Sequence, residues 1–341
     1  MATPPSWIAT RPDEGIDVDA VLERWWGLTA RSIESLPSER DRNLLIQPDA
    51  GAPTVVLKIA NLAEEPAFLE CQGLAAARLA TAGLPVARPI PALDGRTVVG
   101  LGYPGPPWAR LLPWLPGRPL ATIDAASNAV LADLGRVLGR VTAALAGFDH
   151  PASHRLLQWD VLRAVEVVGA NLADVQDSDR RALLMRTLDV LTTRLVPVLP
   201  RLRTSLIHND ANDHNVLVDD AGERITGLLD FGDLLHSVTA HEIAVAAAYA
   251  MFHRDDRVSV LGPLLGAFDA AFALAPEEIE AVPDLIVARL ATSVAISAHQ
   301  GRLDPDPYLR VSEGPGWALL AQLDAIGPAA LRRAAHEAVG R

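Results

Sequence analysis

A chain of 341 residues exceeds the usual size of one domain, so two lobes are expected. Hydrophobic residues make up 50% of it and charged residues 21%, which is the balance of a globular protein with a core. The net charge of −12 excludes nucleic acids and anionic membranes as expected partners, because an acidic surface repels their phosphates.

The first fifteen residues are not typical of a secretion signal, since no basic stretch precedes an apolar one. The single cysteine, Cys71, excludes an intrachain disulfide and a cysteine-based zinc site. We therefore expect a reduced, cytoplasmic protein. The apolar run at residues 258–275 contains Gly262, Pro263 and Asp269, which favours buried helices over a membrane span.

The first third of the chain mixes strands with one main helix. Apolar residues at helical spacing predict a short helix over 18–26, with Asp17 as its N-cap. The β-branched run 54–60 predicts a buried strand, and helical periodicity follows over 65–82. Further strands are expected at residues 97–101 and 109–115.

Lys58 interrupts the predicted strand near its end. A buried lysine is costly unless its charge is paired. Lys58 therefore lies either in solvent on an edge strand or in a cleft, and Glu70 on the following helix is a candidate partner.

Proline and glycine near residues 113–120 indicate a lobe boundary, which divides the chain into residues 1–115 and 116–341. The second part is predominantly helical. Its predicted helices are 125–146, 159–174, 179–202, 239–252, 261–272, 276–299, 315–325 and 329–339. The sequence therefore predicts an α+β protein with a small N-terminal β-sheet lobe, containing one main helix, and a larger, mostly helical C-terminal lobe.

One hairpin is expected within the helical part, with strands at 215–218 and 225–229. Asp210 and Asn215 lie just before its first strand, and Asp230 follows its second. A hairpin brings its outer ends together, so these three oxygen-bearing side chains should converge. Such ligands hold Mg²⁺ beside a phosphate chain.

The spacing H-x-D-x-x-x-x-N from His208 to Asn215, followed by D-F-G from Asp230, resembles the catalytic segments of protein kinases. In this form it is similar to the aminoglycoside phosphotransferase and choline kinase superfamily. The segments HNDANDHNVLV, GLLDFGD, SERDRN and WDVLRA resemble hydroxylysine kinase and the kinase modules fused to class III aminotransferase-type enzymes. The likeness implies a bilobal protein-kinase-like fold over nearly the whole chain.

The resemblance also implies a role for each motif residue. Asp210 accepts the proton of the acceptor hydroxyl, while Asn215 and Asp230 hold Mg²⁺ between the phosphates. Lys58 contacts the phosphates of ATP or GTP, with Glu70 as its ion pair. His208 supports the catalytic loop by hydrogen bonding and is not itself the base.

The nucleotide contacts depart from the protein-kinase pattern at one point. No G-x-G-x-x-G precedes the strand lysine, so Ser38, Arg40 and Asn43 are expected to cover the phosphates in its place. The segment 109–115 matches the hinge between lobes, whose backbone around Leu112 and Trp114 is expected to meet the purine.

Other polar residues near the motif have two interpretations each. Asp213, His214 and Asp233 either bind substrate or a second metal, or they scaffold the loop. Trp159 and Asp160 form either a wall for an ammonium group or a capped core tryptophan. Tyr249 is a candidate for the acceptor pocket. His236, His241 and Glu242 resemble a metal set, although helix capping is preferred to zinc.

The leading expectation is a kinase that transfers the γ-phosphate to the hydroxyl of an amino alcohol or hydroxylated amino acid, as a monomer or homodimer. The resemblance implies a hydroxylysine- or ethanolamine-like acceptor. An antibiotic O-phosphotransferase is an alternative. A non-catalytic, nucleotide-binding pseudokinase also stays open, because the glycine loop is missing.

Overall fold

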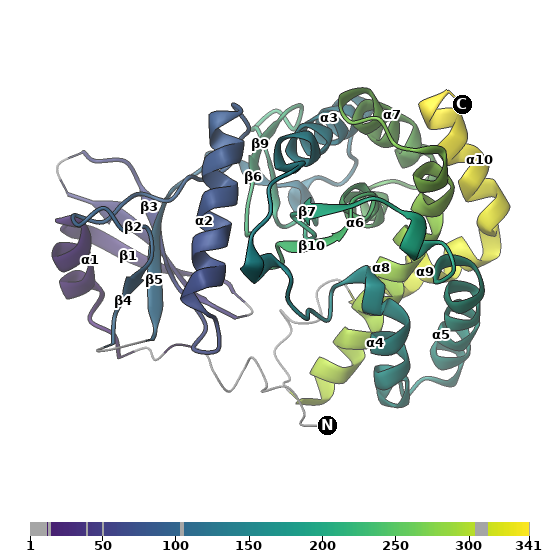
Figure 1. Cartoon of the computed structure of the whole chain (residues 1–341), viewed down its shortest axis with the longest axis horizontal. Coiled ribbons are helices and arrows are strands. Elements are labelled where there is room, and N and C mark those ends of the chain that lie inside the picture. The colour runs from purple at the N-terminus through teal and green to yellow at the C-terminus, as the bar shows by residue number, and fades with distance from the viewer. Residues whose placement is uncertain are drawn as a thin grey trace. The chain divides into compact units, whose positions relative to one another are not determined.

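The computed structural model describes residues 12, 15–38, 40–49, 51–102, 106–303 and 313–340. The chain divides into two compact units, residues 1–115 and 116–341 (Figure 1). The described elements of the first unit are α1 (Val18–Trp26), β1 (Ala30–Leu36), β2 (Arg42–Pro48), β3 (Val55–Ile59), α2 (Pro66–Thr81), β4 (Val99–Gly100) and β5 (Trp108–Pro113).

The first unit is an antiparallel sheet in the order β1-β2-β3-β5-β4. Alternate residues of β3, Val55, Leu57 and Ile59, join the apolar cluster that includes Leu22 and Trp26 of α1. Figure 1 shows α2 on the other side of the sheet from α1. The residues between them in β3, Val56 and Lys58, therefore point to the α2 side, because side chains alternate along a strand.

The predicted first helix is confirmed, together with its cap. The Asp17 carboxylate accepts a hydrogen bond of 3.1 Å from the backbone nitrogen of Ala20. At the other end, Gly27 adopts the left-handed conformation that closes a helix.

The second unit is mostly helical and contains two small antiparallel sheets. Its strands are β6 (Arg118–Pro119), β7 (Thr204–Ile207), β8 (Val216–Val218), β9 (Ile225–Leu228) and β10 (Leu235–Val238). Its α-helices among the described residues are α3 (Asn128–Leu145), α4 (Ala164–Asn171), α5 (Ser178–Val190), α6 (His241–Ala250), α7 (Leu261–Ala271), α8 (Pro276–Leu303), α9 (Glu313–Ile326) and α10 (Pro328–Val339). The expected fold class is confirmed.

The predicted hairpin is β8 and β9, to which β6 adds a third strand. The Asp219 carboxylate orders its turn by accepting the backbone N–H of Glu223 at 2.8 Å. The pair β7 and β10 was not predicted, because each strand has four residues and its partner lies far along the chain.

Two predicted helices are shorter in the structure. The helix expected over 159–174 begins with a capped 3-10 turn and becomes α-helical at Ala164. The helix expected over 179–202 leaves α geometry after Val190, in a π-helical turn at Leu191–Leu195. Periodicity alone does not reveal such changes of helix type, because the apolar spacing continues through them.

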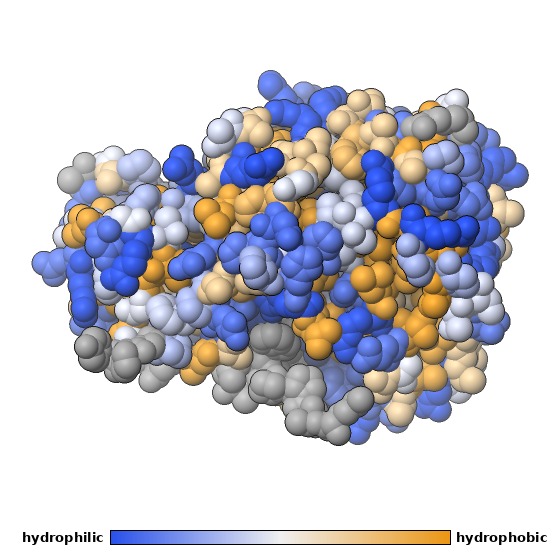
Figure 2. Space-filling model, in the orientation of Figure 1, coloured by the Kyte–Doolittle hydropathy of each residue, from blue (hydrophilic) through white to orange (hydrophobic). Residues whose placement is uncertain are grey.

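Within the described residues, the helices are all too short or too polar to cross a membrane. The apolar run near residue 258 forms a 3-10 turn and α7 instead. On the face drawn in Figure 2, hydrophilic residues interrupt the apolar patches.

Candidate active site

The centre of the site is the loop between β7 and β8, where Asp210 is held through both carboxylate oxygens. Asn215 Nδ2 donates to Asp210 Oδ2 at 2.6 Å. Arg289 Nη2 and Asn212 Nδ2 donate to Oδ1 at 2.8 Å and 3.0 Å. The carboxylate is therefore fixed in one orientation, as a positioned general base requires.

His208 supports this loop, in the role the sequence predicts for it. Its Nδ1 accepts the backbone N–H of Asp210 at 3.3 Å, which leaves Nε2 to donate to the carbonyl of Leu229 at 2.9 Å. Burial lowers the pKa of His208 to about 4, so the ring is neutral at pH 7. The ring also packs edge-on against Phe231 at 4.7 Å.

The hairpin brings the two predicted metal ligands together. The backbone N–H of Leu229 donates to the carbonyl of Asn215 at 2.8 Å, so Asp230 follows one residue after this contact. Asp230 has a positive φ of 55° and accepts the N–H of Gly232 at 3.0 Å. Such strain in a non-glycine residue is typical of functional sites.

A magnesium ion fits the donor set of this hairpin. The amide nitrogen of Asn215 is engaged by Asp210, which leaves the amide oxygen to face a cation. Asp230 adds a carboxylate that is exposed at the surface of its unit. Carboxylate and amide oxygens are the ligands that Mg²⁺ prefers in proteins.

Burial is the main cause of an altered proton affinity at Asp210. It raises the pKa of the carboxyl to about 7, and the negative charge of Asp233 adds to the effect, while Arg289 opposes it. A base with a pKa near neutrality is well matched to proton transfer at physiological pH. Burial also raises the pKa of Glu242, which accepts the His208 backbone N–H at 2.6 Å, to about 7.

Arg289 is a residue of the site that the motifs did not reveal. It lies in the middle of α8 and is 3% exposed. Its Cζ is 4.4 Å from the ring centroid of Trp159 and 5.5 Å from that of Tyr249. The available signal was a lone arginine in the apolar run LIVARLATSVAIS, because such a charge is costly to bury without a purpose.

In the first unit, Lys58 lies in a polar row that crosses the sheet. Asn43 of β2 and Arg110 of β5 are its direct cross-strand neighbours, and all three share the α2 face. Lys58 and Arg110 are 7% and 4% exposed. Of the two interpretations of Lys58, solvent exposure is wrong. Arg110 was missed, and it donates to Gln72 of α2 at 2.6 Å.

Lys58 forms an ion pair with Asp41, whose Oδ2 is 3.6 Å from Nζ. Glu70, the expected partner, is exposed on α2. Its orienting role stays a prediction, and the structure adds Asp41 as an anion beside the lysine. Asp41 was not singled out, because it sits among alternating charges.

The expected phosphate-covering segment is partly a strand. Asn43 belongs to β2 and is not a loop residue, because it pairs with Leu36 of β1. The turn before it is ordered by Ser38 Oγ, which accepts the Asp41 N–H at 3.2 Å, and by the Arg40 carbonyl, which accepts from Asn61. Residue 39 lies outside the described residues.

The two expected purine contacts lie at the end of β5. Leu112 is half-buried in the strand, and the Trp114 ring just after it is 44% exposed. Their contact with a purine stays a prediction.

Two of the six residues predicted for the substrate pocket, Asp213 and Asp160, are engaged in scaffolding. Asp213 accepts from His253 Nε2 at 2.8 Å, while the other ring nitrogen of His253 meets the Ile123 carbonyl. Asp160 caps a turn at Leu162 N and accepts the Ser237 hydroxyl at 2.6 Å. The structure therefore favours the scaffold interpretation for both carboxylates.

The other residues predicted for the substrate pocket differ in solvent exposure. His214 is exposed, whereas Asp233 is 3% exposed and lies near enough to raise the pKa of Asp210. Tyr249 lies in α6, with its hydroxyl 3.4 Å from Arg289 Nη2. One face of the Trp159 ring is covered by Arg289, so a cation of the protein itself occupies the place expected for a ligand ammonium.

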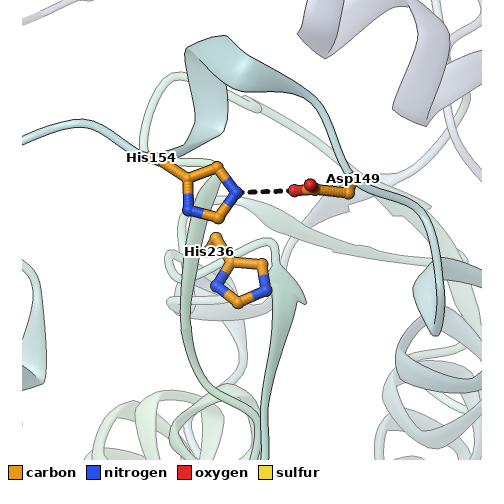
Figure 3. Close-up of side chains that lie close together, drawn as sticks. All are labelled: Asp149, His154 and His236. Carbon is orange, nitrogen blue, oxygen red and sulfur yellow. Dashed lines mark hydrogen bonds and ion pairs between the residues drawn. The ribbon is translucent and has the colours of Figure 1, made fainter.

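The set of His236, His241 and Glu242, for which the sequence favoured helix capping over zinc, does not form a metal site. His241 and Glu242 are buried at the start of α6, and Glu242 is bound to the catalytic loop. His236 instead lies with Asp149 and His154, whose ligand atoms are within 4.8 Å of one another (Figure 3). The two imidazole rings stack at 4.5 Å, and His154 Nε2 is bonded to Asp149 at 2.6 Å. The arrangement is therefore a hydrogen-bonded pair of His154 and Asp149 with the His236 ring stacked on the His154 imidazole.

Comparison with known proteins agrees with this geometry. The model of the phosphotransferase enzyme family matches residues 32–281. Hydroxylysine kinase of Mus musculus is 28% identical over 338 residues, covering 92% of this chain and 89% of that protein. Homoserine kinase of Nitrobacter winogradskyi is 28% identical over 228 residues, covering 64% of this chain and 63% of that protein.

Solved structures extend the likeness to the fold. The microcompartment-associated aminopropanol kinase has a TM-score of 0.69 at 19% identity, covering 95% of this chain and 98% of that chain. Amicoumacin kinase in complex with AMP-PNP and Ca²⁺ has the same TM-score at 17% identity, covering 97% and 95%.

Fold and catalytic loop together define a phosphotransferase of the protein-kinase-like class. This chain belongs to the phosphotransferase enzyme family, as the motifs predicted. Its expected resemblance to hydroxylysine kinase is confirmed as well.

Proposed function

We propose that this protein transfers the γ-phosphate of ATP or GTP to the hydroxyl of a hydroxylated amino acid or a related amino alcohol, with Mg²⁺ as cofactor. The observation that carries the proposal is the fixed Asp210 carboxylate, held by Asn215 beside the hairpin that ends in Asp230. The mouse and bacterial relatives, named for hydroxylysine and homoserine, support an amino-acid acceptor.

In the proposed reaction, the acceptor oxygen forms a bond to the γ-phosphorus while the bond from that phosphorus to the bridging oxygen breaks. The nucleoside diphosphate leaves with the bridging electrons, and Asp210 takes the hydroxyl proton. Asn215 and Asp230 would hold Mg²⁺, which neutralises the phosphate oxygens when bound. His208 keeps Asp210 in place and stays neutral throughout.

For the nucleotide, the row of Asn43, Lys58 and Arg110 supports a contact with phosphates. Lys58, paired with Asp41, and Arg110 are buried cations directly opposite each other in the sheet, an arrangement that favours anionic oxygens beside them. Asn43 Oδ1 is buried without a hydrogen-bond partner among the described residues, so the row also has an unused acceptor. Leu112 and Trp114 are the proposed purine contacts.

The test is a phosphorylation assay with ATP or GTP, Mg²⁺ and separate acceptors: hydroxylysine, homoserine, ethanolamine, choline and an aminoglycoside. We expect turnover of a hydroxylated amino acid or amino alcohol, and a loss of kcat of about 100-fold or more in Asp210→Asn. Asp220→Asn, at an exposed position of the hairpin turn, is the matched control and should keep full activity.

Turnover of the aminoglycoside alone would replace the proposal with an antibiotic phosphotransferase. Nucleotide binding without turnover of these acceptors would support the pseudokinase alternative. Equal activity of Asp210→Asn and the unaltered protein would contradict the assigned base.

A further inference from the structure

Arg289 is a buried guanidinium that holds Asp210, and the proposed phosphoryl transfer gives its other N–H donors no role. Its charge lies within α8, at 3% exposure, between the rings of Trp159 and Tyr249. Removing a guanidinium from water costs several kcal/mol unless its hydrogen bonds and charge are compensated. In this structure Asp210 pairs with the charge of Arg289, whereas the hydrogen bonds of the guanidinium are incomplete.

Three contacts of Arg289 among the described residues leave two of its five N–H donors unused. Nη2 donates to Asp210 Oδ1 at 2.8 Å, with the Tyr249 hydroxyl more distant at 3.4 Å. Nη1 meets the Asn209 carbonyl at 3.3 Å. Nε is buried and has no hydrogen-bond partner among the described residues. A guanidinium presents five N–H donors in a planar fork that suits two oxygens of one anion.

The position of Arg289 relative to Asp210 indicates which anion the unused donors would bind. Asn215, the proposed metal ligand, holds Oδ2 of Asp210, whereas Arg289 holds Oδ1. The guanidinium therefore meets the carboxylate oxygen that the metal ligand does not hold. An acceptor whose hydroxyl reaches Asp210 would bring its neighbouring groups to this side.

We propose that Arg289 binds the carboxylate of the acceptor, which makes a hydroxylated amino acid, and not a plain amino alcohol, the substrate class. This inference rests on the proposed function and narrows it. A carboxylate supplies the two coplanar oxygens that the planar fork of the guanidinium matches. The face of Trp159 that could attract an acceptor ammonium is covered by Arg289.

Matched acceptors that differ only in the carboxylate test the inference. Hydroxylysine is compared with the diamino alcohol that lacks its carboxylate, and homoserine with 3-amino-1-propanol. Both comparisons are made at saturating ATP and Mg²⁺. For at least one pair we expect kcat/KM to favour the amino acid by about 10- to 150-fold, the range of one charged hydrogen-bonding group. Arg289→Met should abolish that preference, mainly through a higher KM for the amino acid.

The decarboxylated member distinguishes binding from positioning. If Arg289 only positions Asp210, Arg289→Met lowers kcat equally for both members of a pair, and the inference is overturned. If it binds the γ-phosphate, the KM for ATP rises instead, with the same conclusion. Arg289→Lys keeps the charge without the fork and should retain a weakened preference. Arg289→Lys also tests the inference if Arg289→Met does not fold.

Failure of this inference differs from failure of the proposed function. Equal turnover of both members by the unaltered protein overturns the carboxylate site and leaves the kinase in place. Absence of turnover with all four compounds overturns both.

Discussion

Three residues discussed above are single ionisable groups in apolar surroundings. Lys58, Arg289 and Glu242 are all less than 8% exposed, and each lies in or beside a run of apolar residues. Their burial is unfavourable, so each needs a partner that the fold or a ligand supplies. For Glu242 the fold supplies this partner, because its carboxylate accepts the backbone N–H of His208 in the catalytic loop.

The raised pKa of Glu242 predicts a pH-dependent stability. Because the folded state binds this proton more tightly, with a pKa near 7 against 4.5, its contribution is complete below pH 4.5 and is lost as the pH rises through 7. Glu242→Gln cannot titrate. Relative to this variant, we expect the free energy of unfolding of the unaltered protein to rise by up to about 3 kcal/mol from pH 8 to 5.

Urea unfolding at several pH values measures this difference, with Glu223→Gln at an exposed turn as the control. A difference between the protein and Glu242→Gln that does not change with pH would show that Glu242 has the same proton affinity in both states.

At the level of elements, helices α3 and α7 are in close contact where α3 has glycine residues. A methyl group on Gly139 would lie 2.7 Å from the carbonyl oxygen of Phe268 and 2.8 Å from the Ala271 Cβ. Both neighbours belong to α7 and cannot move without shifting that helix. The glycines of α3 therefore set how closely the two helices approach.

We predict that Gly139→Ala destabilises the protein by about 1–3 kcal/mol, because overpacking outweighs the gain in helix propensity. Gly169→Ala in α4 is the matched control, since no atom lies within 4 Å of its added methyl group. It should stabilise by about 0.5–1 kcal/mol. Thermal or urea unfolding of the two variants measures both, and stabilisation by Gly139→Ala would contradict the close packing.

For the whole molecule, binding of nucleotide and metal is coupled to folding. With AMP-PNP and Mg²⁺ at about 100 times Kd, the protein should gain about 2.7 kcal/mol and a Tm higher by roughly 2–4 °C. Asp230→Asn should reduce the Mg²⁺-dependent part of this rise, because it removes the anionic ligand. A Tm that rises equally for both proteins would contradict the assigned ligand.

The sequence by itself determined the family, the fold class and the roles proposed for the motif residues. These features depend on local spacing: the hairpin brings Asp210, Asn215 and Asp230 together because its strands are short and adjacent in the chain. For Lys58 the apolar run allowed either an exposed edge strand or a cleft, and only the position of β3 between β2 and β5 excludes the edge.

Only the tertiary structure decided which distant side chains meet. Arg289 lies 79 residues from Asp210 along the chain, and Asp160 lies 77 from Ser237. Periodicity places such residues on a helix face, but their partners depend on how helices and strands pack. For the same reason, the structure assigned Asp160 and Asp213 to scaffolding and added Arg110 to the row of Lys58.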